Sequence, residues 1–122
     1  MASELVLTLF EKWNHALQSG DPKRVTELYA HDAVLLPTIS DLVRHNPQEF
    51  EDYFMLFLKN EPKAHLVESN VRTYTNIAIH SGIYHIQLNQ NRQVQARFTF
   101  VYQKIKTQWL IVEHHSSQMP EQ

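Results

Sequence analysis

Residues 94–119 read VQARFTFVYQKIKTQWLIVEHHSSQM, and the alternation within this stretch decides the fold of the chain. Both halves are rich in β-branched and aromatic residues, which favour strands. A short polar link separates the two halves. The pattern therefore predicts a long antiparallel hairpin that turns near Lys106 and Thr107.

The same hairpin carries the most unusual polar residues of the sequence. Because successive side chains of a strand point to opposite faces, Arg97 lies on the face opposite Phe98. On the second arm, Glu113 and His115 share a face, and His114 lies on the other face. Since the turn does not fix the register, either histidine can share the face of Arg97.

Length and composition limit the class of protein. The chain has 122 residues, of which 43% are hydrophobic, so we expect one domain over residues 1–122. The absence of cysteine excludes a disulfide framework and a thiolate metal site. A net charge of −2 without a cationic cluster argues against nucleic-acid binding. With no basic leader and no long apolar run, we expect a cytoplasmic protein with no membrane contact.

The first third of the chain predicts two successive helices and a short strand. Gly20 ends the first helix, whose apolar stripe recurs every three or four residues: Leu5, Val6, Leu9, Phe10, Trp13, Ala16 and Leu17. Asp21 and Pro22 start the second helix, with an apolar face of Val25, Leu28 and Tyr29. Residues 33–36 form a brief apolar run that Pro37 closes, which predicts a strand.

The remainder predicts a third helix followed by four strands. Asn46, Pro47 and Glu49 form a capping-box arrangement, and the helix behind it has an aromatic face of Phe50, Tyr53, Phe54 and Phe57. Alternating strands then run to the C-terminus, with a bulge or a close approach at Gly82. Helices grouped before strands predict an α+β fold, an antiparallel sheet with its helices on one face.

A family resemblance is carried by Trp13, Gly20-Asp21, Val25, Leu28-Tyr29, Asp32-Ala33-Val34, Leu36-Pro37-Thr38, Arg44, Tyr53-Phe54, Phe57-Leu58, and residues 96–102 and 109–120. Through them the chain resembles the nuclear transport factor two-like (SnoaL-like) superfamily. Within it, the chain is similar to small bacterial homologues of the calcium/calmodulin-dependent protein kinase II association domain. The resemblance implies a cone-shaped fold in which a strongly curved antiparallel sheet wraps the N-terminal helix. It also implies a pocket at the open end and an outer sheet face that pairs with a second copy.

The superfamily hosts many activities on one scaffold, so the residues have to decide between them. In its ketosteroid isomerases, a tyrosine of the first helix and an aspartate before a proline carry the chemistry. The matching residues here are Trp13 and Leu36. Because leucine cannot accept a proton, the isomerase mechanism is disfavoured.

We therefore expect a small-ligand-binding and self-association domain with a pocket for a small polar or anionic molecule. The candidate ligand-binding residues are Arg97, Arg44, Trp13, Tyr29, Tyr84 and Glu113. Neither a cofactor nor a metal is expected. The alternative is a SnoaL-like isomerase, cyclase or dehydratase with His114 or His115 as general base and Trp13 or Arg97 stabilising an oxyanion.

Two placements of Arg97 stay open. Inside an apolar cone its guanidinium would bind an anion. On the outer face it would lie at a dimer interface or pair with Glu113.

The cluster at residues 113–115 has three interpretations. Its histidines are an acid/base group, or polar side chains that satisfy a sheet centre or an interface. As a metal site, Glu113 and His115 need a third ligand such as His80 or His85. A histidine within hydrogen-bond reach of Arg97 or Tyr29 in a closed apolar cavity would favour the enzyme.

A homodimer is expected for a physical reason. The hairpin has large apolar residues on both faces, among them Phe100 on one and Val101 on the other. Three helices cannot cover both faces of the sheet, so the outer face is expected to pair with a second copy.

Overall fold

The computed structural model describes residues 2–121. Its helices are α1 (Ala2–Ser19), α2 (Pro22–Thr26), α3 (Pro47–Phe57) and the short 3-10 helix η1 (Leu58–Asn60). Its strands are β1 (Tyr29–Leu36), β2 (Lys63–Thr73), β3 (Ile77–Gln87), β4 (Gln93–Ile105) and β5 (Gln108–Gln118). This is the predicted α+β order, helices first and long strands last.

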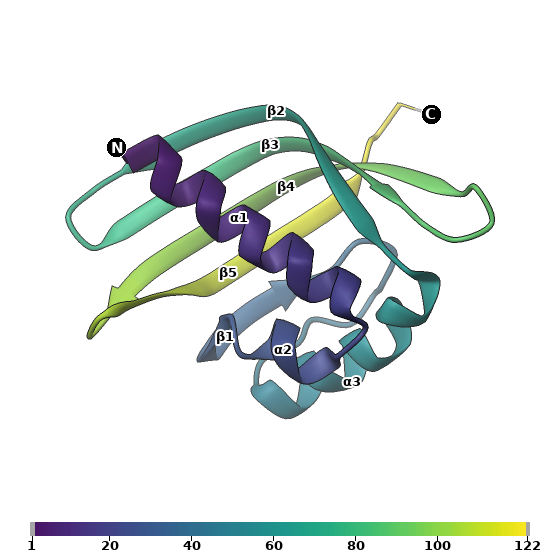
Figure 1. Cartoon of the computed structure of the whole chain (residues 1–122), viewed down its shortest axis with the longest axis horizontal. Coiled ribbons are helices and arrows are strands. Elements are labelled where there is room, and N and C mark those ends of the chain that lie inside the picture. The colour runs from purple at the N-terminus through teal and green to yellow at the C-terminus, as the bar shows by residue number, and fades with distance from the viewer. Residues whose placement is uncertain (1, 122) are drawn as a thin grey trace.

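The five strands form one curved sheet in the order β1-β5-β4-β3-β2, and α1 crosses one face of it (Figure 1). Strands β2 to β5 pair antiparallel, as predicted. The edge strand β1 pairs parallel to β5, which the sequence did not predict. None of the described helices combines the length and apolar character that crossing a bilayer requires.

Strand β1 begins earlier than expected. Tyr29 was predicted on the face of the second helix, but that helix ends at Thr26 and Tyr29 pairs with Ile111 of β5. The amide of Ile111 donates to the carbonyl of Leu28 at 2.9 Å. Pairing with a neighbouring strand therefore overrides the short helical pattern, and it turns the Tyr29 side chain into the core.

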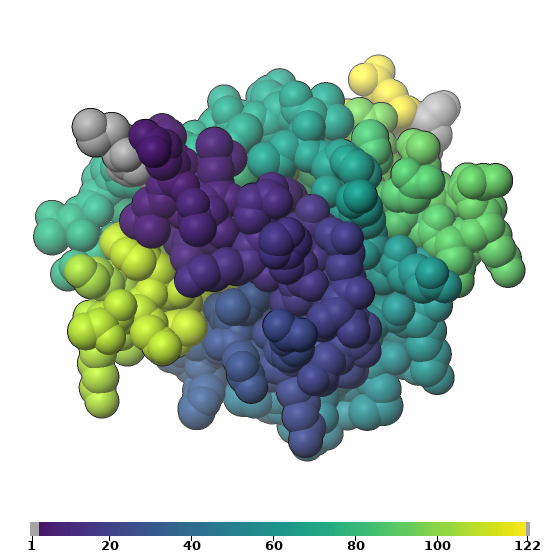
Figure 2. Space-filling view, viewed as in Figure 1, coloured from purple at the N-terminus to yellow at the C-terminus, as the bar shows by residue number. Residues whose placement is uncertain are grey.

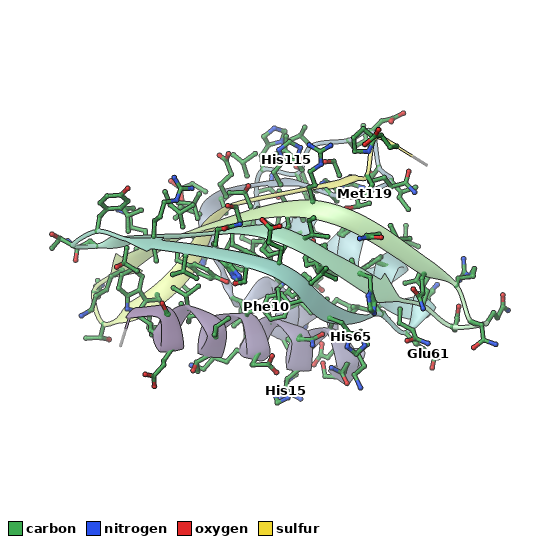
Figure 3. The ribbon with its side chains drawn as sticks, turned by 90° about the horizontal axis from the view of Figure 1, so that it is seen from above. Phe10, His15, Glu61, His65, His115 and Met119 are labelled. Atoms are coloured by element: carbon green, nitrogen blue, oxygen red, sulfur yellow. The ribbon has the colours of Figure 1, made fainter. Side chains whose placement is uncertain are left out.

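Helix α1 packs its apolar stripe against the inner face of the sheet. Figure 3 shows Phe10 between α1 and the strands, His15 on the far side of the helix, and His115 on the opposite side of the sheet. The buried inner-face residues of the central strands are Ala78, His80, Tyr84, Ile86, Ala96, Phe98, Phe100 and Tyr102. The side chains of α1, in purple, lie in front of the sheet in Figure 2.

The long hairpin forms as predicted, with its turn between β4 and β5 and Lys106 in the left-handed region at φ 60°. The register of the hairpin shows which histidine lies on the same face of the sheet as Arg97. Phe100 pairs with His114 and Thr99 pairs with His115, so His115 shares the face of Arg97. His114 lies on the inner face, and this division positions every group of the candidate site.

The predicted helix caps are present, with one difference. Asn46 Oδ1 accepts a hydrogen bond from the Glu49 amide at 3.0 Å, which caps α3. Glu49 does not return the bond to Asn46, as a capping box requires. Its carboxylate accepts from the His45 amide at 2.7 Å, one residue earlier.

Gly82 is the predicted point of close approach. A Cβ atom at this position would lie 2.0 Å from the carbonyl oxygen of Glu68, where β2 bulges against β3. Gly20 differs, because its φ is 75° and a Cβ atom there meets nothing within 4 Å. The two glycines are therefore needed for different reasons, contact at Gly82 and backbone conformation at Gly20.

We expect Gly82→Ala to destabilise the protein more than Gly20→Ala. The added methyl group of Gly82→Ala must displace backbone, which costs about 2–3 kcal/mol or more, whereas a left-handed alanine costs about 1 kcal/mol. Urea unfolding followed by circular dichroism measures both. Equal losses of unfolding free energy in the two variants would show that β2 and β3 can move apart at little cost.

Candidate functional site

Four predicted site residues meet inside the cone. Trp13 comes from α1, Tyr29 from β1, Tyr84 from β3 and His114 from β5, and each is at most 3% exposed. The rings of Trp13 and Tyr84 stack at an interplanar angle of 4°, and His114 stacks on Phe100 with centroids 4.0 Å apart. The sequence predicted these residues individually, and the fold brings them together.

His114 is held between two tyrosines. Tyr29 Oη lies 2.9 Å from His114 Nδ1, and Tyr84 Oη lies 3.3 Å from His114 Nε2. Trp13 Nε1 donates to Tyr29 Oη at 3.2 Å. Both ring nitrogens of His114 therefore have partners, as a buried imidazole requires.

Burial sets the charge state of this cluster. It lowers the pKa of His114 to about 3, with a smaller effect of His115, so the imidazole is neutral at pH 7. Burial also raises the pKa of Tyr29 well above its usual value. His114 meets the geometric condition of a hydrogen bond to Tyr29. However, a base with so low a pKa and no free nitrogen accepts a substrate proton poorly near neutral pH.

Two cavities lie beyond this cluster, at the mouth of the cone. The inner one has a volume of about 20 Å³, the room of a single water, and Trp13, Tyr84 and His114 are among its lining residues. The outer one has about 360 Å³, which suits a small organic molecule. The outer cavity lies between α3, the loop after β1 and the turn between β3 and β4. The two share Thr38, Tyr53, Phe57 and Ile86 as lining residues.

Arg44, one of the candidate ligand-binding residues, lines the outer cavity. Its backbone exchanges two hydrogen bonds of 2.9 Å with Leu35 of β1, which fixes its position. Its guanidinium lies 5.0 Å from the centre of the Tyr53 ring and donates to Ser40 Oγ at 2.5 Å. A cation–π contact of this kind holds the charge over the cavity wall.

Arg92 is a second cation on the same cavity, and the sequence prediction missed it. Its Nη2 atom donates to Asn89 Oδ1 at 2.7 Å and to Asn60 Oδ1 at 3.1 Å. The described lining of this cavity contains no acidic residue. Among residues 2–121, no carboxylate lies within ion-pair distance of Arg44 or Arg92.

The other predicted site residues lie elsewhere. Arg97, Glu113 and His115 are exposed on the outer face of the sheet, because alternation turns them away from His114. Interior placement of Arg97 and His115 is therefore wrong. Arg97 also does not pair with Glu113, which is opposite Val101.

The metal interpretation fails on the same geometry. His80 is buried on the inner face, opposite Glu113 and His115, and so cannot complete their ligand set, whereas His85 is on the outer face with them. Within the described part of the chain, no three acidic or histidine side chains come close enough to hold a metal ion.

Sequence reasoning also missed Ser116 and Thr38. Tyr84 Oη donates to Ser116 Oγ at 2.8 Å, and Ser116 in turn is hydrogen-bonded to Thr38 Oγ1. Ser116 had a usable signal, since it is two residues from His114 on the same strand and so shares its face. Thr38 and Arg92 lie in connecting segments, where alternation carries no information.

The fold of the chain is that of known proteins. A protein from Pseudomonas putida described as NTF2-like and of unknown function has a TM-score of 0.82 at 19% identity, over 95% of this chain and 84% of that chain. A protein from Streptomyces avermitilis, described as a putative dehydratase of the NTF2-like family, has a TM-score of 0.79 at 15% identity, over 97% of each chain. These similarities define the nuclear transport factor two-like cone fold.

Sequence similarity narrows the class to a family. Residues 2–120 match the calcium/calmodulin dependent protein kinase II association domain family, and the chain belongs to that family. A Xanthomonas campestris structure described as a putative association domain of this kind is 44% identical. Its TM-score is 0.92, over 96% of this chain and 87% of that chain. No curated protein is significantly similar to the chain.

We expect acid to destabilise the fold through two buried histidines. Burial lowers the pKa of His80 to about 4 and that of His114 to about 3, both below the ordinary value of 6.5. As the pH falls below about 6.5, the unfolded chain binds protons that the folded chain does not. Each histidine then removes up to about 1.4 kcal/mol of stability per pH unit, until the pH reaches its folded pKa.

Urea unfolding between pH 7 and pH 4 measures this slope. We expect His114→Gln to reduce the slope while lowering stability at pH 7, because one buried proton acceptor is gone. His15→Gln is the matched control, since His15 is exposed on α1. An unchanged slope in His114→Gln would mean that His114 is protonated in the folded state.

Proposed function

We propose that the protein is a self-associating domain that binds a small organic anion at the mouth of its cone. The single observation that carries the binding proposal is a largely apolar cavity of about 360 Å³, in which Arg44 and Arg92 are the only charged residues of the described lining. Apolar walls with a few fixed polar groups are typical of small-molecule sites. The two guanidinium groups give that site its preference for negative charge.

The chemistry of the two arginines supports a carboxylate in particular. A guanidinium presents a planar fork of donors that matches two carboxylate oxygens. Arg44 uses Nη1 for Ser40 and Leu42, so its other donors have no partner among the described residues. The rings of Tyr53 and Phe57 stack at 16° and offer an apolar wall for the body of the ligand.

The outer face of the sheet supports a homodimer. It carries half-buried apolar residues from three strands: Val34, Leu36, Ile79, Ile83 and Val101. Around them lie exposed charges of both signs, Glu68, Arg72, Arg97 and Glu113. A two-fold interface places the same patch on both copies, so a face with both signs can pair each charge with its opposite. Membership of an association-domain family supports the same conclusion.

The alternative, a SnoaL-like enzyme, has weaker support. His114 is the right type of residue near the mouth of the cone and contacts Tyr29 at 2.9 Å. Its neighbouring cavity, however, holds only about 20 Å³, and both its nitrogens are already bonded. His115, the other candidate base, is exposed on the outer face.

Benzoate is a suitable probe for the anion site, because it combines one carboxylate with an apolar ring. We expect it to perturb the amide signals of residues around the outer cavity in an NMR titration. Arg44→Gln and Arg92→Gln should each raise the Kd by about ten-fold, the effect of losing one charge-assisted contact of about 1.4 kcal/mol.

Arg97→Gln is the matched control for this experiment. It removes the same charge from the outer face and should leave the Kd unchanged. Binding that weakens with Arg97→Gln and persists in Arg44→Gln would place the anion on the outer face and overturn the proposal.

Light scattering tests the dimer. We expect about 29 kDa at micromolar concentration, twice the chain mass of 14.4 kDa. Ile79→Asp should give monomers, because it puts a charge into the apolar centre of the outer face. Met55→Asp is the control, because Met55 is exposed on α3, away from the outer face, and this variant should stay dimeric. A wild-type monomer would refute the proposed interface.

A further inference from the structure

A hydrogen-bond chain crosses the interior from α1 to the mouth of the cone. Its six members, in order, are Trp13, Tyr29, His114, Tyr84, Ser116 and Thr38. The first five are at most 5% exposed, and Thr38 is half-buried and lines both cavities. The chain therefore connects the core to the wall of the ligand pocket.

The two ends of the buried part give the chain a direction. An indole N–H can only donate, so Trp13 donates to Tyr29. Tyr84 donates its only proton to Ser116. Since Tyr84 has no second proton, its contact with His114 Nε2 requires that Nε2 carry the hydrogen. A neutral imidazole then has Nδ1 as an acceptor, which takes the proton of Tyr29.

The other neutral tautomer of His114, with the hydrogen on Nδ1, would leave a buried hydroxyl proton without an acceptor. If Nδ1 carried the hydrogen, Tyr29 would accept from both Trp13 and His114, and its own hydroxyl proton would have no acceptor. Tyr29 is 3% exposed and makes no other hydrogen bond among the described residues. A buried donor without a partner costs about 1–3 kcal/mol, so the Nε2–H tautomer is favoured.

Matching each donor with an acceptor also gives the direction of the hydrogen bond between Ser116 and Thr38. Ser116 is 5% exposed and already accepts from Tyr84. If Thr38 also donated to it, the Ser116 proton would be the one without an acceptor. Ser116 therefore donates to Thr38, and the Thr38 proton is the only one in the chain with no acceptor among the described residues.

We propose that the Thr38 hydroxyl is a fixed hydrogen-bond donor to the pocket ligand and a specificity-determining group of the anion site. This inference rests on the proposed function. Accepting from Ser116 uses one lone pair of Thr38 Oγ1, and what the chain leaves without a partner is the Thr38 proton, which needs an acceptor on the ligand. The ligand group that takes the Thr38 proton must therefore carry a lone pair, as a carboxylate oxygen does and an ammonium group does not.

The direction of the chain can be tested without any ligand. Long-range ¹H–¹⁵N NMR spectra of the imidazole distinguish a protonated ring nitrogen from an unprotonated one. At pH 7 we expect Nε2 of His114 to carry the hydrogen and Nδ1 to be unprotonated. A spectrum with the hydrogen on Nδ1, or on both nitrogens, overturns the inference even if the pocket binds anions.

The role of Thr38 is tested with benzoate. Thr38→Val removes the hydroxyl at nearly constant shape and should raise the benzoate Kd by about ten-fold, the effect of one hydrogen bond to a charged group. Thr38→Ser keeps the hydroxyl and should restore wild-type affinity, which separates the donor from a general effect on the loop.

The outcomes for the two proposals are distinguishable. If Arg44→Gln weakens benzoate binding and Thr38→Val does not, the anion site stands and the role of Thr38 is refuted. If neither wild type nor Thr38→Ser binds benzoate, the anion proposal fails for carboxylates, and Thr38 has no such ligand to select.

Discussion

The structure depends on keeping one imidazole neutral inside an aromatic interior. Burying a polar ring costs several kcal/mol unless its donors and acceptors are matched. Tyr29 and Tyr84 provide that match, and they come from strands far from His114 in sequence. Because Trp13 is hydrogen-bonded to Tyr29, the same network links α1 to three strands of the sheet. A displacement of any of these four elements would leave a buried polar group without a partner.

Most of the fold could be predicted from local patterns, because alternation, caps and turn residues act over a few positions. The hairpin turn at Lys106 and the N-cap at Asn46 are examples. The parallel pairing of β1 could not be predicted, since it depends on a partner strand about 80 residues away. The sequence also could not show which of His114 and His115 faces inward. That depends on the register of the hairpin, which a bulge between Val101 and Tyr102 shifts.

The candidate site was predicted in most of its buried half and at Arg44, but not at Arg92. Aromatic and histidine residues on strands follow the two-residue period, so their faces can be worked out once the register is known. The cationic half comes from connecting segments. Arg92 follows Gln90 and Asn91, both in the left-handed region at φ 61° and 58°, and this backbone geometry positions its side chain. No side-chain period in the sequence encodes such a turn.

Strand β5 gives the proposed binding and association functions a common origin. Its inward residues His114 and Ser116 belong to the chain that ends at the pocket, whereas its outward residues Glu113 and His115 lie on the proposed dimer face. Neighbours in sequence therefore belong to different surfaces, separated by the thickness of one strand.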